Sequence, residues 1–479
     1  MYNGLTVLPV LRSPLVEGGN KRSESRKGYE RNFKIESLRG DQMIQVLQEE
    51  IDKIRASLAL RYESEYAAFS TPFDPECVTA VITMIERCKE LRPTMFVLVG
   101  IGGSNMGTLA VLQALKGVYY NEKAAAPIFL CADTIDNDTN ASLLAQVERE
   151  LGNGGRVIVC IVTKSGTTTE TLINGALLIE LLKKHRPVDY KNYVMAITDQ
   201  GSPLHAIAQK NNYMLLEIPK LVGGRFSVFS AVGLFPLGMM GIDILAFCEG
   251  AQEMLGASLE TTNIVEPIDT APMGAESIDT GSNHSEAGTQ ALVLYEQYQA
   301  GHIIHDFFVF SPDLFMLANW YKQLVGESLG KKYDLNGNVV EVGFTPTVSV
   351  GTVDLHSVVQ LYLAGPRHTT TTFIYFDDEK STLKVPSNEL SAVVPGLAGR
   401  TVTEVKNAIL RGVMQAYDDE KRPFMPQPLQ KTSHSLGQFM MLKMLETVLL
   451  ARLFNINPFD QPAVELYKQR AREFLGSKT

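Results

Sequence analysis

The chain has 479 residues, of which 45% are hydrophobic and 20% are charged. This composition is typical of globular proteins, and it excludes wholesale disorder and fibrous repeats. The length predicts two or three domains. The formal net charge of −9 argues against a nucleic-acid-binding protein, because a broadly acidic surface repels phosphate backbones. A small anionic substrate stays compatible with this charge, since a few local cations can oppose the overall field.

The cysteines and the N-terminus indicate a cytoplasmic protein. The five cysteines are scattered and lack the spacing of a zinc site, so a reducing compartment fits best. The N-terminal residues show no charged leader before an apolar core, and no secretory signal is therefore expected. The longest uncharged stretch, Phe226–Ile242, is interrupted by glycines and a proline. It predicts a buried helical segment rather than a membrane span.

Residues 1–90 are expected to form an N-terminal arm followed by helices. The run Lys21–Arg31 has five basic and two acidic residues, which is typical of a solvated arm. Apolar residues from Ile44 to Ile54 recur near helical spacing, and they predict a helix that ends at about Leu60.

Five short apolar runs between residues 91 and 260 alternate with helical patterns, for instance Leu109–Leu115 and Leu172–Lys184. This alternation predicts a parallel sheet covered by helices on both faces, and ligands of such sheets bind beyond the carboxyl ends of the strands. We therefore predict a first α/β domain over residues 91–260. Its expected strands are Met95–Gly100, Pro127–Ala132, Val157–Thr163, Tyr193–Thr198 and Met214–Pro219.

A polar stretch from Thr261 to Gly288 indicates a linker, and a second strand–helix series predicts a second α/β domain over residues 285–430. From Ser435 the pattern indicates two helices, so residues 431–479 are expected to form a C-terminal helical extension. The predicted fold class is thus α/β, with two domains built on parallel sheets plus N- and C-terminal helical extensions. The expected strands of the second domain are His302–Phe310, Pro346–Val350 and Thr370–Phe376.

The first expected strand runs into a glycine-rich loop, Gly100 to Gly107, that precedes a helix. Glycines let the backbone approach a ligand, and a helix N-terminus presents free N–H groups to an anion. A dinucleotide fingerprint would need glycine where Asn105 stands, and a Walker A loop would need lysine at Thr108. A tight turn and an anion site both remain open for this loop.

The third expected strand ends in a loop, Thr163–Thr171, with six hydroxyl residues in nine positions and Lys164 among them. Thr167 and Glu170 fit a capping box, so one interpretation is a well-capped helix. One hydroxyl suffices for that cap, whereas several hydroxyls and amides together suit a phosphate group. Since this loop and the glycine-rich loop lie at the same end of the predicted sheet, we favour an anion site.

Gly223 and Gly224 precede Arg225 just after the fifth expected strand. A glycine pair before an arginine lets the guanidinium enter a crowded site, and the position at the carboxyl end of a strand favours a ligand role. A surface arginine in a turn is at least as common for so short a motif, and both interpretations stay open.

The segment from Ser311 to Lys331 is expected to be helical to about Val325 and to turn at the following glycine. Gln323 lies four residues before Glu327, so the two side chains meet on one side of the helix exit. A glutamate at a helix end is usually just solvated, and the motif alone does not distinguish that from a catalytic carboxylate.

His356 is the one histidine of eight that lies just beyond an expected strand and opens a helix. That position suits a proton-transfer group, although a helix-terminal histidine held by hydrogen bonds is an equal alternative. Near the C-terminus Asp460 fits a helix N-cap, and Gln461 and Lys468 are seven residues apart. This spacing puts two side chains on one helical face about 10 Å apart. They could contact the two ends of a sugar phosphate, but an ordinary amphipathic surface helix shows the same spacing.

Six of these motifs, in this order, resemble the phosphoglucose isomerase family over roughly residues 90–475. The resemblance implies two sugar-isomerase αβα sandwich domains. It also implies reversible conversion of glucose 6-phosphate to fructose 6-phosphate, in glycolysis and gluconeogenesis, without cofactor or metal. The motifs are GIGGSNMG, TKSGTTTET, GGRFS, GESLGK, TVDLHS and PFDQPAVELYK.

The resemblance also implies a role for each matched residue. Glu327 would shuttle a proton between C1 and C2, Arg225 would stabilise the enediolate, and Gln323 would line the site. His356 and Lys468 would assist ring opening, and the histidine would come from the second subunit of a homodimer with shared active sites. The residues expected around the substrate phosphate are Ser104, Thr163, Lys164, Ser165 and Thr168, helped by Gln461. Gly103 is also expected to bind the substrate.

Two departures from the family pattern leave this chemistry intact: Ala463 stands where glycine is usual, and Thr163 stands where serine is usual. The main alternative is a non-catalytic sugar-phosphate sensor, against which the full set of proton-transfer residues argues. Activity on mannose 6-phosphate ranks lower, and an NAD-dependent enzyme is disfavoured because the glycine fingerprint fails. The expected partners are a small sugar phosphate and a second copy of the chain, with no nucleic acid and no membrane.

Overall fold

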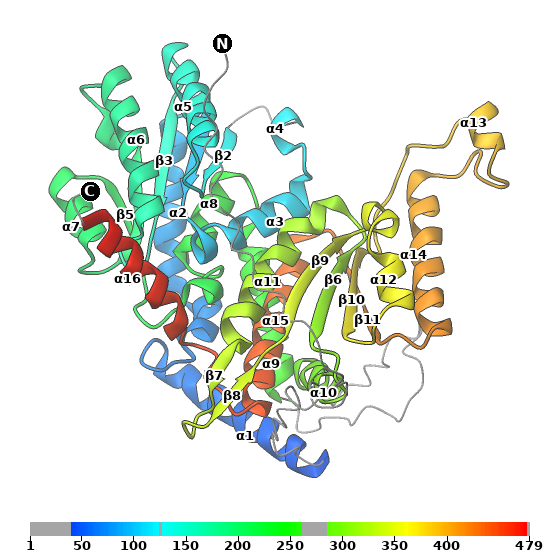
Figure 1. Ribbon diagram of the computed structural model, residues 1–479. Helices are drawn as coiled ribbons and strands as arrows, with labels where there is room; N and C mark the ends of the chain where they lie inside the picture. Colours follow the sequence, from blue (N-terminus) through cyan, green and yellow to red (C-terminus); the bar gives the residue numbers. More distant parts are fainter. Residues whose placement is uncertain (1–39, 124–126, 261–284, 477–479) are drawn as a thin grey trace, which may run out of the picture. The chain divides into compact units, whose positions relative to one another are not determined.

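Figure 1 shows the computed structural model, which describes residues 40–123, 127–260 and 285–476. The arm expected around Lys21–Arg31 lies outside these residues, as does most of the linker expected from Thr261 to Gly288. The expected end of the linker is wrong: Ser285 caps helix α10 (Glu286–Gln299) by accepting a hydrogen bond from the Gly288 N–H. Helical structure therefore begins earlier than the polar sequence indicates.

The first sheet has five strands in the order β2-β1-β3-β4-β5, and every neighbouring pair is parallel. All five predicted strands are confirmed to within one residue at each end. β1 and β3 are buried along their whole length, as expected for parallel strands covered on both faces. The strands are β1 Met95–Val99, β2 Ile128–Ala132, β3 Val157–Val162, β4 Val194–Asp199 and β5 Met214–Ile218.

Two groups of helices pack around this sheet (Figure 1). α5 (Asn137–Gly152) and α6 (Thr169–His185) pack on each other and on β3, whereas α8 (Ala231–Met239) packs with α2 (Pro75–Glu90) and α3 (Met106–Lys116). All nine residues of α8 are buried, which confirms the predicted buried helical segment. Across the residues that the structure describes, we find no helix with the length and apolar character needed to span a bilayer.

The second sheet has four parallel strands in the order β11-β10-β6-β9. Three of them are predicted from the sequence, but β11 is not, because Pro426 and Pro428 interrupt it. Proline lacks the N–H of a central strand and is tolerated at a sheet edge, and β11 is an edge strand. The antiparallel β7–β8 hairpin is also unexpected. The strands are β6 Ile304–Val309, β7 Lys331–Tyr333, β8 Val339–Val342, β9 Thr345–Val350, β10 Thr369–Phe376 and β11 Phe424–Leu429.

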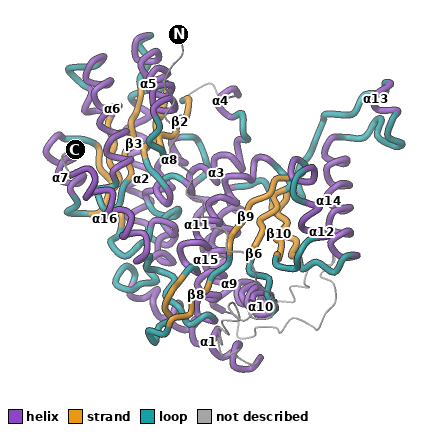
Figure 2. The backbone as a smooth tube through the Cα atoms, in the orientation of Figure 1, coloured by secondary structure: helices purple, strands orange, loops and turns teal. Residues whose placement is uncertain are grey.

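Helix α15 (Ser433–Leu453) is buried along most of its length. It packs against α10 and also against α1 (Gly40–Ser57), α9 (Ile244–Glu260) and α11 (Phe315–Leu329), as Figure 2 shows among the purple helices. A helix that is apolar on all sides is expected in the core of a large protein. α16 (Pro462–Gly476) follows, so both predicted C-terminal helices are present. The remaining helices are α4 Tyr120–Lys123, α7 Pro203–Asn211, α12 Val359–Ala364, α13 Glu389–Ala392 and α14 Val402–Asp419.

Helix α11 continues past the point where the sequence predicts its end. The turn expected at Gly326 is wrong, because the helix runs through this residue to Leu329. A glycine inside a helix costs about 1 kcal/mol relative to alanine, and burial of Val325 and Leu329 offsets this cost. Glu327 therefore lies within the helix, one turn after Gln323.

A cluster of buried polar side chains joins α11 to α15 and to the second sheet. The Tyr321 hydroxyl donates to Glu446 Oε1 at 2.9 Å and lies 3.2 Å from His305 Nδ1. Lys443 Nζ lies 2.5 Å from Glu446 Oε2, and both side chains are fully buried. Lys443 also donates to Gln290 Oε1 on α10. We call these five residues the buried polar cluster, and we expect it to hold α11 in place because a buried charge needs its partners.

We expect the buried polar cluster to make the protein sensitive to acid through His305. Burial, with the Lys443 charge adding to it, lowers the pKa of His305 from 6.5 to about 3. The unfolded chain takes up a proton here below about pH 6.5, whereas the folded protein does so only near pH 3. Stability therefore falls as the pH drops through this window.

The loss due to His305 should be about 3 kcal/mol between pH 7 and pH 4, since one pKa unit corresponds to about 1.4 kcal/mol. Urea unfolding of the wild type and of His305→Gln at both pH values measures this loss. The variant should lose about that much less stability on acidification, and equal losses in the two proteins would contradict the prediction.

Candidate active site

Two of the loops singled out in the sequence start at adjacent positions on the carboxyl edge of the first sheet. β1 and β3 are neighbouring strands, and Val99 pairs with Ile161 near their ends. The loops that follow these strands are therefore next to each other. This edge is where parallel α/β sheets bind their ligands.

The loop after β1 forms a short 3-10 helix, Gly102–Ser104, before α3 begins at Met106. Asn105 is buried, and its Nδ2 donates to Asp133 Oδ2 at 3.0 Å, which ties the loop to the end of β2. The Asn105 side chain makes no cap hydrogen bond to α3. The first N–H groups of this helix are thus not taken up by its N-cap, and such groups favour an anion.

The capping-box interpretation of the loop after β3 is wrong. α6 begins at Thr169, its N-cap is Thr168, and no side-chain hydrogen bond caps it. The Thr168 hydroxyl instead lies 2.8 Å from the Thr163 hydroxyl. Thr198 Oγ1 donates to the Thr163 carbonyl at 2.6 Å, and burial lowers the pKa of Lys164. The hydroxyls of this loop are therefore not consumed by helix capping.

The glycines of the first and third motifs are in direct contact. A Cβ atom added at Gly103 would lie 2.1 Å from the carbonyl carbon of Gly224 and 2.7 Å from the backbone nitrogen of Arg225. Only glycine allows so close an approach. The contact places the loop after β1 directly against the backbone that carries Arg225.

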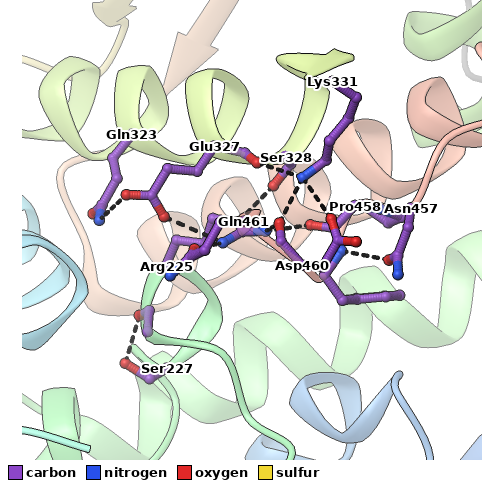
Figure 3. Close-up of polar contacts among 12 residues, drawn as sticks. Arg225, Ser227, Gln323, Glu327, Ser328, Lys331, Asn457, Pro458, Asp460 and Gln461 are labelled. Atoms are coloured by element: carbon purple, nitrogen blue, oxygen red, sulfur yellow. Dashed lines mark hydrogen bonds and ion pairs between the residues drawn. The ribbon is translucent and has the colours of Figure 1, made fainter. Parts of the chain in front are cut away.

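Arg225 is only 3% exposed, so it is not the surface arginine of the alternative interpretation. Nε donates to Ser328 Oγ at 2.7 Å, and Nη1 donates to Gln461 Oε1 (Figure 3). Nη2 donates to the backbone carbonyls of Pro458 and Asp460. Burial lowers the pKa of Arg225, and the charge of the neighbouring Glu327 opposes that shift. The guanidinium is thus a cation held in one position from several sides.

Glu327 faces Arg225 across the site, with Oε2 at 3.2 Å from Nη1. Its other oxygen, Oε1, accepts a hydrogen bond from Gln323 Nε2 at 3.1 Å (Figure 3). The Glu327 side chain is 32% exposed, so a ligand can reach the carboxylate. Gln323 also approaches the loop after β1, since a Cβ atom added at Gly102 would lie 2.8 Å from Gln323 Nε2. The glycine-rich loop, Arg225 and Glu327 therefore belong to one site.

The site also contains Ser328, Lys331 and Asp460, which the sequence motifs alone do not predict to be site residues. Lys331 Nζ donates to the carbonyl oxygens of Glu327 at 2.8 Å and Asp460 at 2.5 Å. It also lies 3.0 Å from the Asp460 carboxylate, so Asp460 pairs with a lysine in addition to preceding α16. Lys331 is part of the GESLGK motif, four residues after Glu327, and this spacing is the signal that could have identified it.

Two observations bear on what the site can bind. Gln323 Oε1 is buried and has no hydrogen-bond partner among the described residues, so an acceptor next to Glu327 is left unused. In the described part of the chain, no group of three or more His, Cys, Asp and Glu side chains is placed to hold a metal ion.

His356 and Lys468 lie apart from these residues. His356 is exposed at the end of a short 3-10 helix, Val353–His356, and α12 begins only at Val359, so it does not open a helix as expected. Lys468 lies on α16, where its ammonium pairs with Glu465 at 2.8 Å. Within residues 40–123, 127–260 and 285–476, no hydrogen bond or ion pair joins either side chain to Arg225 or Glu327.

Two parallel sheets with helical extensions and a site at the carboxyl edge define an α/β protein of the sugar-isomerase fold class. A glucose-6-phosphate isomerase structure from Chlamydia trachomatis superimposes with a TM-score of 0.72 at 20% identity, over 92% of this chain and 86% of its own. A hypothetical protein from Thermus thermophilus gives a TM-score of 0.77 at 27% identity, over 91% and 97%. The predicted fold class is confirmed.

The chain belongs to the phosphoglucose isomerase family, whose model matches residues 88–478. The glucose-6-phosphate isomerase of Carboxydothermus hydrogenoformans is 30% identical over 421 residues, which cover 86% of each chain. That of Rubrobacter xylanophilus is 30% identical over 436 residues, 90% of this chain and 94% of its own. The family resemblance of the motifs is thus confirmed, and the protein is an isomerase.

Replacing Gly103 with alanine is expected to lower isomerase kcat/KM by about 100-fold. The added methyl group must displace the backbone of Gly224 and Arg225, and a misplacement of about 1 Å within an active site costs roughly this factor. Gly152→Ala is the matched control, since a Cβ atom there meets nothing within 4 Å. A Gly103→Ala enzyme with more than half of the wild-type activity would contradict the prediction.

Proposed function

We propose that the protein interconverts glucose 6-phosphate and fructose 6-phosphate by ring opening and proton transfer between C1 and C2, as a step of glycolysis and gluconeogenesis. The observation that carries this proposal is the Arg225–Glu327 pair, a partly exposed carboxylate 3.2 Å from a buried guanidinium. A carboxylate can take a proton from one carbon and return it to the next. A fixed cation stabilises the negative charge that develops on oxygen.

The substrate phosphate would bind at the two loops on the carboxyl edge of the first sheet. Ser104, Ser165 and Thr168 retain exposed surface there, and Lys164 would add a positive charge. Thr163 is buried with its hydroxyl against Thr168, so it would act by orienting that neighbour. The remaining residues proposed to contact the phosphate are Gly103, through its backbone, and Gln461.

Glu327 would be the base that removes the proton from C2 and delivers it to C1. Gln323 would orient the carboxylate through its Nε2 donor and would accept a hydrogen bond from a substrate hydroxyl at its unpaired Oε1. Arg225 would stabilise the enediolate, because its position is held by five acceptors before the charge develops. These roles are the ones that the family resemblance implies, and the contacts of Glu327, Gln323 and Arg225 in this chain support them.

Ring opening would use His356 and Lys468, with His356 supplied by a second copy of the chain. The exposure of His356 supports this, since a buried histidine could not enter another subunit. Residues 378–401, around α13, extend away from the second sheet in Figure 1. They carry exposed apolar side chains that a second copy could cover: Leu383, Leu390, Val393 and Val394. We therefore propose a homodimer with shared active sites.

We further propose that the protein acts in the cytoplasm, without cofactor, metal, nucleic acid or membrane. The five free cysteines support a reducing compartment. The proposed domain division is an N-terminal arm and helices over residues 1–90, sugar-isomerase domains over 91–260 and 285–430, and C-terminal helices over 431–479 that carry part of the active site.

A coupled assay on the purified protein tests the proposed function. Glucose 6-phosphate should be converted to fructose 6-phosphate at the same rate with and without a metal chelator, and mannose 6-phosphate should be turned over more slowly. Trp320, the only tryptophan, lies on α11 one turn before Gln323, and its fluorescence should respond to binding. A fluorescence response to glucose 6-phosphate without any turnover would overturn the proposal in favour of a sugar-phosphate sensor.

A further inference from the structure

Lys331 is a buried lysine between the end of α11 and the C-terminal segment 458–461. It is 8% exposed, and Figure 3 shows its ammonium among three acceptors. These are the carbonyls of Glu327 and Asp460, at 2.8 and 2.5 Å, and the Asp460 carboxylate at 3.0 Å. The ammonium therefore makes two hydrogen bonds to carbonyl oxygens and one ion pair.

These contacts join segments that are distant in the sequence. The Glu327 carbonyl lies in the last turn of α11, where carbonyls lack partners within the helix and a cation is favourable. Asp460 directly precedes Gln461, whose Oε1 accepts a hydrogen bond from Arg225. Lys331 therefore holds the segment that carries Gln461 against the helix that carries Glu327.

Arg225 is the second cationic side chain that donates to this segment. It donates to the carbonyls of Pro458 and Asp460, so Lys331 and Arg225 share the Asp460 carbonyl. Without Lys331, segment 458–461 would be linked to α11 mainly through Arg225, which donates to Pro458 and Asp460 of the segment and to Ser328 of α11. Any movement of the segment would then move the Arg225 guanidinium relative to Glu327 and admit water between them.

We propose that Lys331 is a positioning residue for the isomerisation: it keeps segment 458–461 closed over the Arg225–Glu327 pair. A proton taken from C2 is then returned to C1 rather than lost to solvent. This inference rests on the proposed function. A buried ammonium is costly even when it is paired, and an apolar side chain often stabilises the fold as well or better. The charge of Lys331 is therefore better explained by a role in the geometry of the site than by a contribution to folding stability.

The test compares Lys331→Met with Lys331→Arg and with Lys332→Met, a control at the neighbouring exposed lysine. Each enzyme converts glucose 6-phosphate in D₂O, and we measure kcat, KM, Tm and the deuterium incorporated at C1 of the product per turnover. Lys331→Met should lower kcat about tenfold to 100-fold and raise deuterium incorporation about twofold, because water enters the site. Lys331→Arg should recover part of both values, and Lys332→Met should match the wild type.

Wild-type kcat and wild-type deuterium incorporation in a folded Lys331→Met enzyme would overturn the inference. A lower kcat with unchanged incorporation would also overturn it, since a partly unfolded preparation gives that result. If Lys331→Met does not fold, Asp460→Asn carries the test, because its carboxylate is 53% exposed and folding should tolerate the change. Unchanged incorporation in Asp460→Asn would then overturn the inference. Absence of turnover in the wild type would instead refute the proposed function, so the two failures are distinguishable.

Discussion

Replacing Glu327 with glutamine should lower the kcat for glucose 6-phosphate by about 10³-fold, within the roughly 10²–10⁴-fold that a positioned general base contributes. Glutamine has nearly the same shape and can still accept the hydrogen bond from Gln323, but it cannot take up the C2 proton. KM should change much less than kcat, since the phosphate is proposed to bind at the loops of the first sheet. The measurements are the coupled assay and the exchange of the C2 proton with solvent.

Two controls accompany this variant. Glu180→Gln removes a carboxylate that is 71% exposed on α6, and it should leave the kcat unchanged. Thermal unfolding should show a loss of no more than about 1 kcal/mol for Glu327→Gln, because its ion pair with Arg225 is partly exposed on the carboxylate side. A folded Glu327→Gln enzyme that keeps more than a tenth of the wild-type kcat, with wild-type proton exchange, would rule out Glu327 as the base.

Replacing Lys443 with methionine should destabilise the protein by about 3–5 kcal/mol, which is the usual cost of breaking a buried ion pair from one side. Lys443 and Glu446 are both fully buried and 2.5 Å apart. The variant leaves the Glu446 carboxylate with the Tyr321 hydroxyl but without a positive charge. The free energy of unfolding in urea measures the loss.

The double variant Lys443→Met/Glu446→Leu provides the control. Replacing both members of a buried ion pair by apolar residues is often neutral, so it should recover at least half of the lost stability. Tyr321 keeps His305 as a hydrogen-bond partner in this variant. A double variant that is less stable than Lys443→Met alone would show that the cost comes from packing rather than from an uncompensated charge.

The strands of the first sheet could be predicted from the sequence because their signal is local. β1 and β3 are continuous apolar runs, the pattern of parallel strands buried on both faces. β11 carries Pro426 and Pro428, and it is a strand because it pairs with β10 at the edge of the second sheet. The secondary-structure propensities of residues 424–429 carry no information about that pairing. The same reason explains Gly326, whose place within α11 depends on the packing of its neighbours.

The residue types of the candidate site could also be predicted, but their roles in the geometry could not. The Gly-Gly-Arg motif alone is compatible with two positions of Arg225, in a surface turn or in a ligand site. Its burial follows from contacts with Ser328, Pro458 and Gln461, which come from two other parts of the chain. Lys331 was missed because a lysine after a helix is usually solvated, and its acceptor Asp460 lies 129 residues away.

The order and types of the residues were therefore enough to establish a parallel α/β protein of the phosphoglucose isomerase family, with a glycine-rich loop, a hydroxyl-rich loop and a glutamate one turn after a glutamine. The fold alone revealed that Arg225 is buried against Glu327, that the Thr163 hydroxyl lies against the Thr168 hydroxyl, and that Lys331 contacts both α11 and segment 458–461. Periodicity, capping and turn preferences act over a few residues, and they can be recognised along the chain. Burial, ion pairing and close backbone approach depend on which distant segments meet, and only the folded chain brings those segments together.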